Sequence, residues 1–286
     1  MRIRRGIMAS PEHFEILYEL KTNLAMDKTR QPDRATALRQ WRDLREALTQ
    51  YGVSILSWPS AGPGISDFTF VANAGLPIPG TDAFILSNFH HQERRLEIPH
   101  LKKFLQNEFE LVELAPDEEF EGGDAFFWRD DILFIAYGVR TNLNGALAVG
   151  RLVKNLAPRT TVELLPMEFW VEQGSRKEMS FYHRDMCCLP LRNKLTFLVY
   201  PYSFTFAALR ILEHYGELVF ATRDQAYHFV CNGIEIDGKN VILPWLNDHT
   251  VKQFLDDFGY SNIHICPTSE FWLSGGGPQC LFLEIP

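Results

Sequence analysis

Apolar residues recur at helical spacing in some segments of the chain and alternate with polar residues in others. Apolar positions three and four residues apart predict a helix over residues 34–51, which Asp33 caps and Gly52 ends. Asn142 and Asp248 are the predicted caps of two later helices. The predicted helices cover about residues 34–51, 97–108, 143–156, 204–215, 223–229 and 248–258.

Short apolar or alternating segments between these helices predict β-strands. Polar turns at 129–131 and 237–240 join neighbouring strands into hairpins. His183 and Asp185 are two residues apart and would share one face if their segment were extended. The predicted strands cover about residues 14–20, 53–58, 66–76, 83–89, 109–114, 125–128, 132–137, 160–166, 181–190, 195–200, 217–220, 232–243, 262–266 and 281–285.

Strand, hairpin, helix and strand follow one another several times, and no clear linker interrupts the series. Such cycling favours radial repetition of small α/β units within a single domain spanning residues 1–286. A doubly wound parallel sheet is the alternative, but the frequent hairpins speak against it. The expected fold class is therefore α/β, built as a propeller of repeated units.

Composition narrows the function classes without identifying one. The 286 residues are 46% hydrophobic and 22% charged with a net charge of −8, which is ordinary for a soluble globular protein. The basic residues form no long block, so nucleic acid is not an expected partner. No apolar window is long enough to predict a membrane span, and the start of the chain does not resemble a signal peptide. Five cysteines without framework spacing fit free thiols in a reducing compartment, so the expected location is the cytoplasm.

The glycine-rich segment at 274–280 carries the most specific chemical hint. Three consecutive glycines and a proline predict a turn without Cβ atoms, which lets another group approach the backbone closely. The turn delivers Cys280 to the start of the apolar segment 281–285. Two interpretations are open at this point: Cys280 is a nucleophile, or it is a buried core cysteine.

Polar residues at other strand ends and glycine turns add to this hint. Carboxylates can bind a planar guanidinium through paired charged hydrogen bonds. A thiolate can attack the guanidinium carbon, and a histidine can protonate the departing amine. No cysteine or histidine pair has the spacing of a zinc site, and no dinucleotide or phosphate-binding glycine motif is present. The candidates are Asp67 with Asn73, Glu121 with Asp124, His183 with Asp185, and Cys280.

Six short motifs occur in the order seen in the guanidine-modifying enzymes, and the chain resembles that superfamily from about residue 14 to its end. The superfamily includes dimethylarginine dimethylaminohydrolases, arginine deiminases, arginine dihydrolases and glycine amidinotransferases. Its fold, the pentein, is a five-bladed α/β propeller with the site in a central channel, and the resemblance implies no metal or organic cofactor. The motifs are Asp67-Phe-Thr-Phe-Val-Ala-Asn73-Ala-Gly, Glu93-Arg94, Glu121-Gly-Gly-Asp124, Gly138-Val-Arg140-Thr-Asn, His183-Arg-Asp185 and Gly275-Gly-Gly-Pro-Gln-Cys280.

The resemblance implies a role for each matching residue. Cys280 is the expected nucleophile that forms a covalent thiouronium adduct, and His183 the expected general acid, which then activates water. Glu121 is expected to orient the histidine. The expected substrate-binding residues are Asp67 and Asp185 for the guanidino nitrogens, Arg94 and Arg140 for the substrate carboxylate, and Asn73, Asp124 and Asn23 around them.

Two departures from the superfamily pattern bear on the substrate. Arg184 stands where an apolar residue is more common, and the segment 19–26, which contains Asn23, is looser than in the closest relatives. The Ala-Asn-Ala-Gly pattern around Asn73 resembles the bacterial branch that contains the arginine dihydrolases, although Asn73 can equally cap a loop. The expected activity is hydrolysis of a guanidino C–N bond of arginine or an N-methylarginine. Two alternative functions stay open: an amidinotransferase, and a non-catalytic relative that binds guanidino ligands. The oligomeric state is also open, and a homo-oligomer is one possibility.

Overall fold

A computed structural model describes residues 2–173, 178–245 and 249–286. Its described part contains the predicted mixture of helices and short strands, so the α/β class is confirmed. None of the helices in these ranges combines the length and the apolar character needed to cross a membrane.

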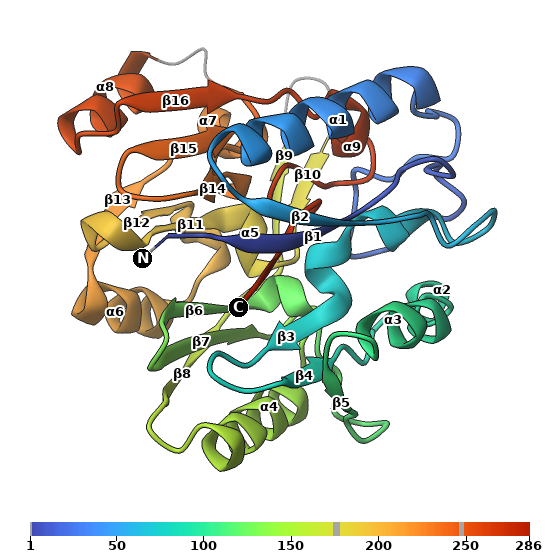
Figure 1. The fold of residues 1–286 in the computed structure, drawn as a ribbon. Coiled ribbons are helices and arrows are strands. Elements are labelled where there is room, and N and C mark those ends of the chain that lie inside the picture. Colours follow the sequence, from blue (N-terminus) through green and yellow to red (C-terminus); the bar gives the residue numbers. More distant parts are fainter. Residues whose placement is uncertain (1, 174–177, 246–248) are drawn as a thin grey trace.

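One unit recurs along the described chain (Figure 1): a three-stranded sheet whose middle strand pairs antiparallel with one neighbour and parallel with the other. A helical segment precedes the parallel outer strand in every unit, as a parallel connection requires. The repeating strand, hairpin and helix pattern predicted from the sequence is therefore confirmed. The sheets are β17 (Leu283–Ile285), β1 (Arg5–Ala9) and β2 (Ser54–Trp58); β3 (Gly75–Pro77), β4 (Ala83–Leu86) and β5 (Glu110–Val112); β6 (Ala125–Arg129), β7 (Ile132–Tyr137) and β8 (Thr161–Pro166); β11 (Cys188–Leu191), β12 (Thr196–Val199) and β13 (Glu217–Phe220); and β14 (Ile234–Glu235), β15 (Asn240–Leu243) and β16 (Asn262–Ile265).

The two ends of the chain meet in one sheet, because β1 pairs with β17 in the register Arg5 to Ile285. A separate hairpin is formed by β9 (Trp170–Gln173) and β10 (Glu178–Phe181). The helices are α1 (Arg34–Gln50), α2 (Gln92–Arg95), α3 (Ile98–Leu105), α4 (Leu143–Leu156), α5 (Arg184–Cys187), α6 (Phe206–Tyr215), α7 (Arg223–Tyr227), α8 (His249–Asp257) and α9 (Ser269–Trp272).

Side-chain caps set the starts of two long helices where the sequence predicts them. Asp33 accepts a hydrogen bond from the Thr36 N–H at 2.7 Å at the start of α1. Asn142 accepts one from the Gly145 N–H at 2.7 Å at the start of α4. Each bond satisfies an N–H that has no partner within the helix. The predicted cap Asp248 lies outside the described residues.

Two predicted strands are wrong. Residues 14–20 keep the alternating burial of a strand, but the backbone of Ile16 bonds to the Gln31 side chain instead of a neighbouring strand. The segment 66–76 forms two 3₁₀ helices, Ser66–Thr69 and Val71–Ala74, before β3 begins. Every residue of both 3₁₀ helices is buried, so the alternation of a half-buried strand has no place there.

The segments around the candidate histidine and cysteine also differ from the prediction. His183 precedes the short helix α5, which contains Asp185, so the two do not share one face of a strand. Cys280 lies in a turn, and β17 begins only at Leu283. In both places a turn replaces the expected strand.

Candidate active site

Cys280 is buried, and three polar contacts surround it. Its Sγ atom lies 3.2 Å from Asn232 Nδ2, which donates a hydrogen bond, and 3.4 Å from Asp185 Oδ2, which accepts one. The backbone N–H of Cys280 donates to Asn232 Oδ1 at 3.4 Å. Burial, followed by the negative charge of Asp185, raises the pKa of the Cys280 thiol well above its ordinary value. The thiol is therefore protonated at neutral pH.

The glycine turn before Cys280 is needed because side chains fill the space around its backbone. Gly275 has a positive φ of 73°, and a Cβ atom there would lie 2.6 Å from Asn23 Oδ1. A Cβ on Gly276 would lie 2.3 Å from the Phe70 ring, and one on Gly277 would lie 2.6 Å from the oxygen of Asn232. The predicted close approach to a Cβ-free backbone is confirmed, and the approaching groups include Asn232, which holds the cysteine.

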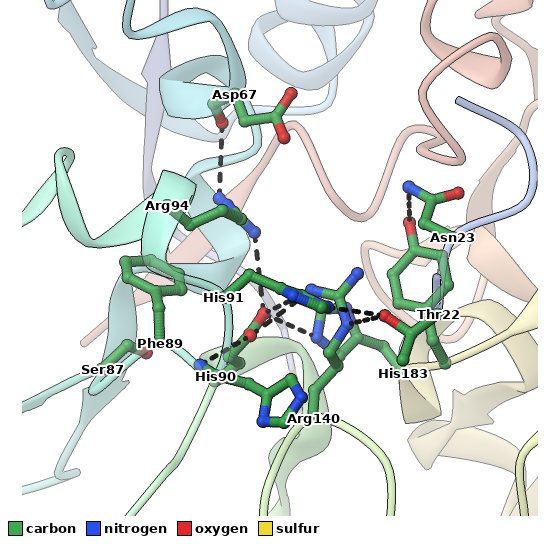
Figure 2. Close-up of polar contacts among 12 residues, drawn as sticks. Thr22, Asn23, Asp67, Ser87, Phe89, His90, His91, Arg94, Arg140 and His183 are labelled. Atoms are coloured by element: carbon green, nitrogen blue, oxygen red, sulfur yellow. Dashed lines mark hydrogen bonds and ion pairs between the residues drawn. The ribbon is translucent and has the colours of Figure 1, made fainter. Parts of the chain in front are cut away.

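His183 is bonded to a carboxylate that two arginines also hold. Its Nε2 atom lies 2.9 Å from Glu121 Oε2. Arg140 Nη1 lies 3.4 Å and Arg94 Nη1 lies 3.7 Å from the same oxygen; Figure 2 shows Arg94, Arg140 and His183 converging there. Burial alone would raise the pKa of Glu121, but Arg140, His183 and Arg94 together lower it below its ordinary value. Glu121 is therefore ionised and can stabilise a protonated His183.

The two arginines are held rigidly. Arg94 donates two hydrogen bonds to Glu97, at 2.7 and 2.9 Å, and its guanidinium lies 4.6 Å from the centre of the Phe89 ring. Arg140 donates to Thr22 Oγ1 at 2.7 Å and lies over the Tyr182 ring. Fixed guanidinium groups of this kind suit recognition of a carboxylate.

Asp67 is the second buried carboxylate near the cysteine. Its Oδ2 accepts a hydrogen bond of 2.7 Å from the Tyr18 hydroxyl, and its Oδ1 accepts one of 3.5 Å from Ser274. Burial raises the pKa of Asp67, and the positive charge of Arg94 acts in the opposite direction.

Among the predicted site residues, two buried acceptor oxygens have no hydrogen-bond partner within the described part of the chain: Asn73 Oδ1 and Asp185 Oδ1. Both residues face the glycine turn that precedes β6. A Cβ atom on Gly123 would lie 2.5 Å from Asn73 Oδ1, 3.3 Å from Asp185 Oδ2 and 3.3 Å from His183 Nδ1. The absence of a side chain at Gly123 thus lets three functional groups gather at one point. A buried acceptor without a donor is costly, so the place is suited to a ligand that brings N–H groups.

A small cavity of about 10 Å³ lies beside these groups, which is about the room that one water molecule needs. The segment from Tyr18 to Asn23 covers it, since Tyr18 bonds to Asp67, Thr22 to Arg140, and the Asn23 amide to the Tyr182 hydroxyl at 3.1 Å. The lining includes Leu20, Asn23, Asp67, Phe70, Asn73, Arg94, Arg140, Tyr182, Ser274, Gly276 and Cys280.

The structure brings nearly all of the predicted site residues together. Asp124 stands apart because its oxygens accept hydrogen bonds from the Thr141 hydroxyl at 2.7 Å and the Arg184 N–H at 3.0 Å. Like Glu121, His183 and Asp185, it does not line the small cavity. Burial raises the pKa of Asp124 to about 6. Within the described ranges no cluster of three or more His, Cys, Asp or Glu side chains is arranged to hold a metal ion.

Sequence reasoning missed several residues that hold the site in place. Asn232 contacts both the thiol and the backbone of Cys280, yet it ends the 3₁₀ helix Val230–Asn232 far away in the sequence and belongs to no recognisable motif. Tyr18 and Thr22 lie in a segment predicted partly as a strand, and Tyr182 reads as a core aromatic because it sits next to Phe181.

Comparisons with known proteins agree with this arrangement. No protein-family model matches the sequence. The chain is 28% identical over 98% of its length to the bifunctional arginine dihydrolase/ornithine cyclodeaminase ArgZ of Synechocystis sp., and spans 37% of that protein. It is 30% identical over 99% of its length to an uncharacterised protein of Caenorhabditis elegans, ZK1307.1, and spans 94% of it.

Solved structures give the same picture. The N-terminal domain of ArgZ bound to product, described as an arginine dihydrolase, superposes with a TM-score of 0.84 at 27% identity, over 99% of this chain and 97% of that one. A dimethylarginine dimethylaminohydrolase shares the fold, with a TM-score of 0.76 at 18% identity, over 98% of this chain and 99% of that one. The chain belongs to the guanidine-modifying superfamily, in the part of it near the arginine dihydrolases.

Proposed function

We propose that this protein hydrolyses a guanidino C–N bond through a covalent adduct on Cys280, and that L-arginine is its substrate. The observation that carries the proposal is the pair of buried, unpartnered acceptor oxygens, Asn73 Oδ1 and Asp185 Oδ1, beside a buried thiol. A guanidinium is flat, positively charged and rich in N–H donors, so it matches acceptors and carboxylates of this kind.

Asp67 and Asp185 are proposed to hold the guanidino nitrogens and place the guanidinium carbon before Cys280 Sγ. Arg94 and Arg140, which line the same cavity, are proposed to hold the substrate's carboxylate. A cavity of about 10 Å³ is too small for arginine, so the segment from Tyr18 to Asn23 must be displaced while the substrate binds.

The buried thiol must lose its proton before it can attack. A guanidinium next to Sγ offsets the negative charge of Asp185 and lowers the pKa of Cys280. We therefore propose that the substrate activates its own nucleophile. The released proton passes to His183, whose imidazolium the ionised Glu121 stabilises.

In the first step a bond forms between Sγ and the guanidinium carbon. The bond from that carbon to one amino nitrogen then breaks, and His183 gives its proton to the departing ammonia. In the second step His183 takes a proton from a water molecule, which attacks the same carbon. The C–S bond then breaks, His183 returns its proton to the departing sulfur, and the hydroxyl proton on the carbon leaves to solvent, which releases the ureido product and regenerates the Cys280 thiol.

The proposed assignment to arginine dihydrolysis rests on Asn73. A second round on the ureido product would consume another water and release ammonia, carbon dioxide and ornithine. Asn73 Oδ1 is buried and accepts no hydrogen bond from a described residue, so it can accept one from an N–H group attached to the ureido carbon, or from the second water. The similarity to the N-terminal domain of ArgZ, described as an arginine dihydrolase, supports this choice.

An amidinotransferase is the second candidate, because the same adduct can be resolved by an amine instead of water. A relative that only binds guanidino ligands is the third, and the joint presence of Cys280, His183 and Glu121 in one site argues against it. We further propose that residues 1–286 form one domain and that the repeated sheets are blades arranged around a central channel.

The test is to incubate the protein separately with L-arginine, asymmetric dimethylarginine and agmatine and to identify the products by mass spectrometry. Arginine dihydrolysis gives ornithine with twice as much ammonia, whereas a deiminase stops at citrulline and a dimethylargininase releases dimethylamine. A parallel arm with glycine as amine acceptor detects amidino transfer. If none of the three compounds is converted, or if Cys280→Ser converts them as well as the wild type, the proposal is wrong.

A further inference from the structure

A second and much larger cavity, of about 480 Å³, lies on the other side of the catalytic residues. Gly123 and Asp185 form part of its wall. Because Asp185 also contacts the Cys280 thiol, the wall between this cavity and the cysteine is thin. Its other walls come from β3, β6 and the C-terminal segment, and Figure 1 shows the C-terminus beside β3 and β6. A cavity of this volume is large enough for a small organic ligand.

Arg184 is the unusual residue in this cavity. It is buried, with 4% of its surface exposed, and its guanidinium lies 4.5 Å from the centre of the Phe126 ring. Its side chain donates only to backbone carbonyls, those of Cys188 at 3.3 Å and Ala125 at 3.1 Å. Its Nε atom is buried without an acceptor, and no carboxylate within the described ranges forms an ion pair with it. A buried cation without a counter-charge is costly.

Arg4, at the exposed rim of the same cavity, makes no side-chain hydrogen bond or ion pair with any described residue. The other cations on the lining are already engaged: Arg192 is paired with Glu284 at 2.8 Å, and Arg2 donates to the Tyr51 carbonyl at 3.0 Å. The side-chain carboxylates of the lining are Asp130, Asp185 and Glu284, and Pro286 also lines it. Two cations are thus left without a carboxylate partner among the described residues, one at the depth of the cavity and one at its rim.

The remaining wall is apolar, with Leu76, Phe126, Phe282 and Leu283 among its members. We propose that this cavity is a binding site for a small organic anion, whose carboxylate or phosphate group contacts Arg184 and is also attracted by the charge of Arg4 at the rim, and whose apolar part packs against these side chains. The site adjoins the catalytic one and shares Gly123 and Asp185 with it, but it does not depend on the reaction proposed above.

The experiment is isothermal titration calorimetry of the full chain with two probes, benzoate and inorganic phosphate. Benzoate carries a carboxylate and an apolar ring, while phosphate carries charge alone, so their comparison identifies the preferred head group. Arg184→Met removes the charge but keeps an unbranched side chain over Phe126, and Arg184→Lys keeps the charge. Arg4→Gln removes the rim charge, and Arg159→Gln is the matched control because Arg159 is also exposed but lines neither cavity.

If the cavity is an anion site, at least one of the two probes binds the wild-type protein. Because a hydrogen bond to a charged group contributes about 1.5–3 kcal/mol, Arg184→Met should weaken that binding at least about tenfold. Arg184→Lys should restore part of the affinity, Arg4→Gln should weaken binding several-fold, and Arg159→Gln should not change it. If Arg184→Met does not fold, as judged by circular dichroism, the affinities of Arg4→Gln and Arg159→Gln for the probe are compared and test the proposal instead. Absence of binding to the wild type, or equal affinity in these two exposed variants, would overturn the proposal.

Discussion

Burial and, after it, the negative charge of Asp185 are the structural reasons why Cys280 is not a thiolate before the substrate arrives. Asp185 Oδ2 lies 3.4 Å from Cys280 Sγ. A unit charge at such a distance contributes about 5 kcal/mol at an effective dielectric constant of about 20. That interaction favours the protonated thiol, so removal of the charge lowers the pKa of Cys280. Asp185→Asn, which keeps the shape of the side chain, should therefore make the thiol more acidic and abolish turnover.

The assay is the pH dependence of iodoacetamide alkylation at Cys280, followed by mass spectrometry of the peptide that contains it, because four further cysteines are buried elsewhere. The wild type should show an apparent pKa above the usual thiol range, which L-arginine lowers. Asp185→Asn should show the lower value without any ligand. Asp124→Asn is the matched control, since this buried carboxylate makes its bonds to Thr141 and the Arg184 N–H. An apparent pKa that is unchanged in Asp185→Asn, and unchanged by L-arginine in the wild type, refutes the reasoning.

Three further predictions follow from the same contacts. Glu121→Gln removes the carboxylate that Arg94, Arg140 and His183 share. Because His183 loses the charge that stabilises its protonated form, we expect activity to fall at least about 100-fold in steady-state kinetics. Because two buried arginines lose a counter-charge, we expect the free energy of unfolding to fall by about 3 kcal/mol in urea denaturation. Gly123→Ala places a Cβ 2.5 Å from Asn73 Oδ1, so the rate constant of the reaction should fall at least about tenfold. Burial, and after it the charge of Arg140, lower the pKa of His91 from 6.5 to about 4. As the pH falls below 6.5, this side chain therefore takes up a proton in the unfolded chain before it does so in the folded protein. The contribution of His91 to stability is complete above pH 6.5 and is lost as the pH falls toward 4, so between pH 7 and pH 5 the wild type should lose on the order of 1 kcal/mol more than His91→Gln in urea denaturation.

Each of these predictions has an outcome that contradicts it. Full activity in Glu121→Gln would mean that the carboxylate does not support His183. Gly150→Ala, which has its nearest contact at 3.3 Å with a Val162 methyl group, is the control for Gly123→Ala, and equal activity of the two would show that the turn tolerates a side chain. Parallel pH profiles of stability for the wild type and His91→Gln would show that His91 titrates alike in the folded and unfolded chains.

Local signals of the fold were predictable from the sequence because they act over a few residues. The caps Asp33 and Asn142 and the hairpin of β6 and β7 depend on neighbours within a turn of the chain. The segments 14–20 and 66–76 were mispredicted because tertiary contacts override their patterns. Gln31 takes the hydrogen bonds that a strand partner would make. The second segment forms two fully buried 3₁₀ helices, and a short apolar segment of this kind cannot be told from a buried strand by its pattern alone.

The candidate site shows the same division. Cys280, His183, Glu121 and Asp67 stand next to glycines or at ends of elements, and the resemblance to a superfamily relates them to one another. Asn232 carries no such signal, since only folding brings its amide to Cys280 across 48 residues of chain. The role proposed for Arg184 likewise depends on a cavity that no local pattern predicts.

The central claim is that a guanidino carbon becomes bonded to Cys280 during turnover. The most direct measurement is acid quenching of the protein a few milliseconds after mixing with L-arginine, followed by intact-mass analysis and peptide mapping. We expect an adduct whose mass corresponds to arginine less ammonia, located on the peptide that contains Cys280, present in the wild type and absent in Cys280→Ser. Turnover of arginine by Cys280→Ser, or an adduct on another residue, would contradict the account.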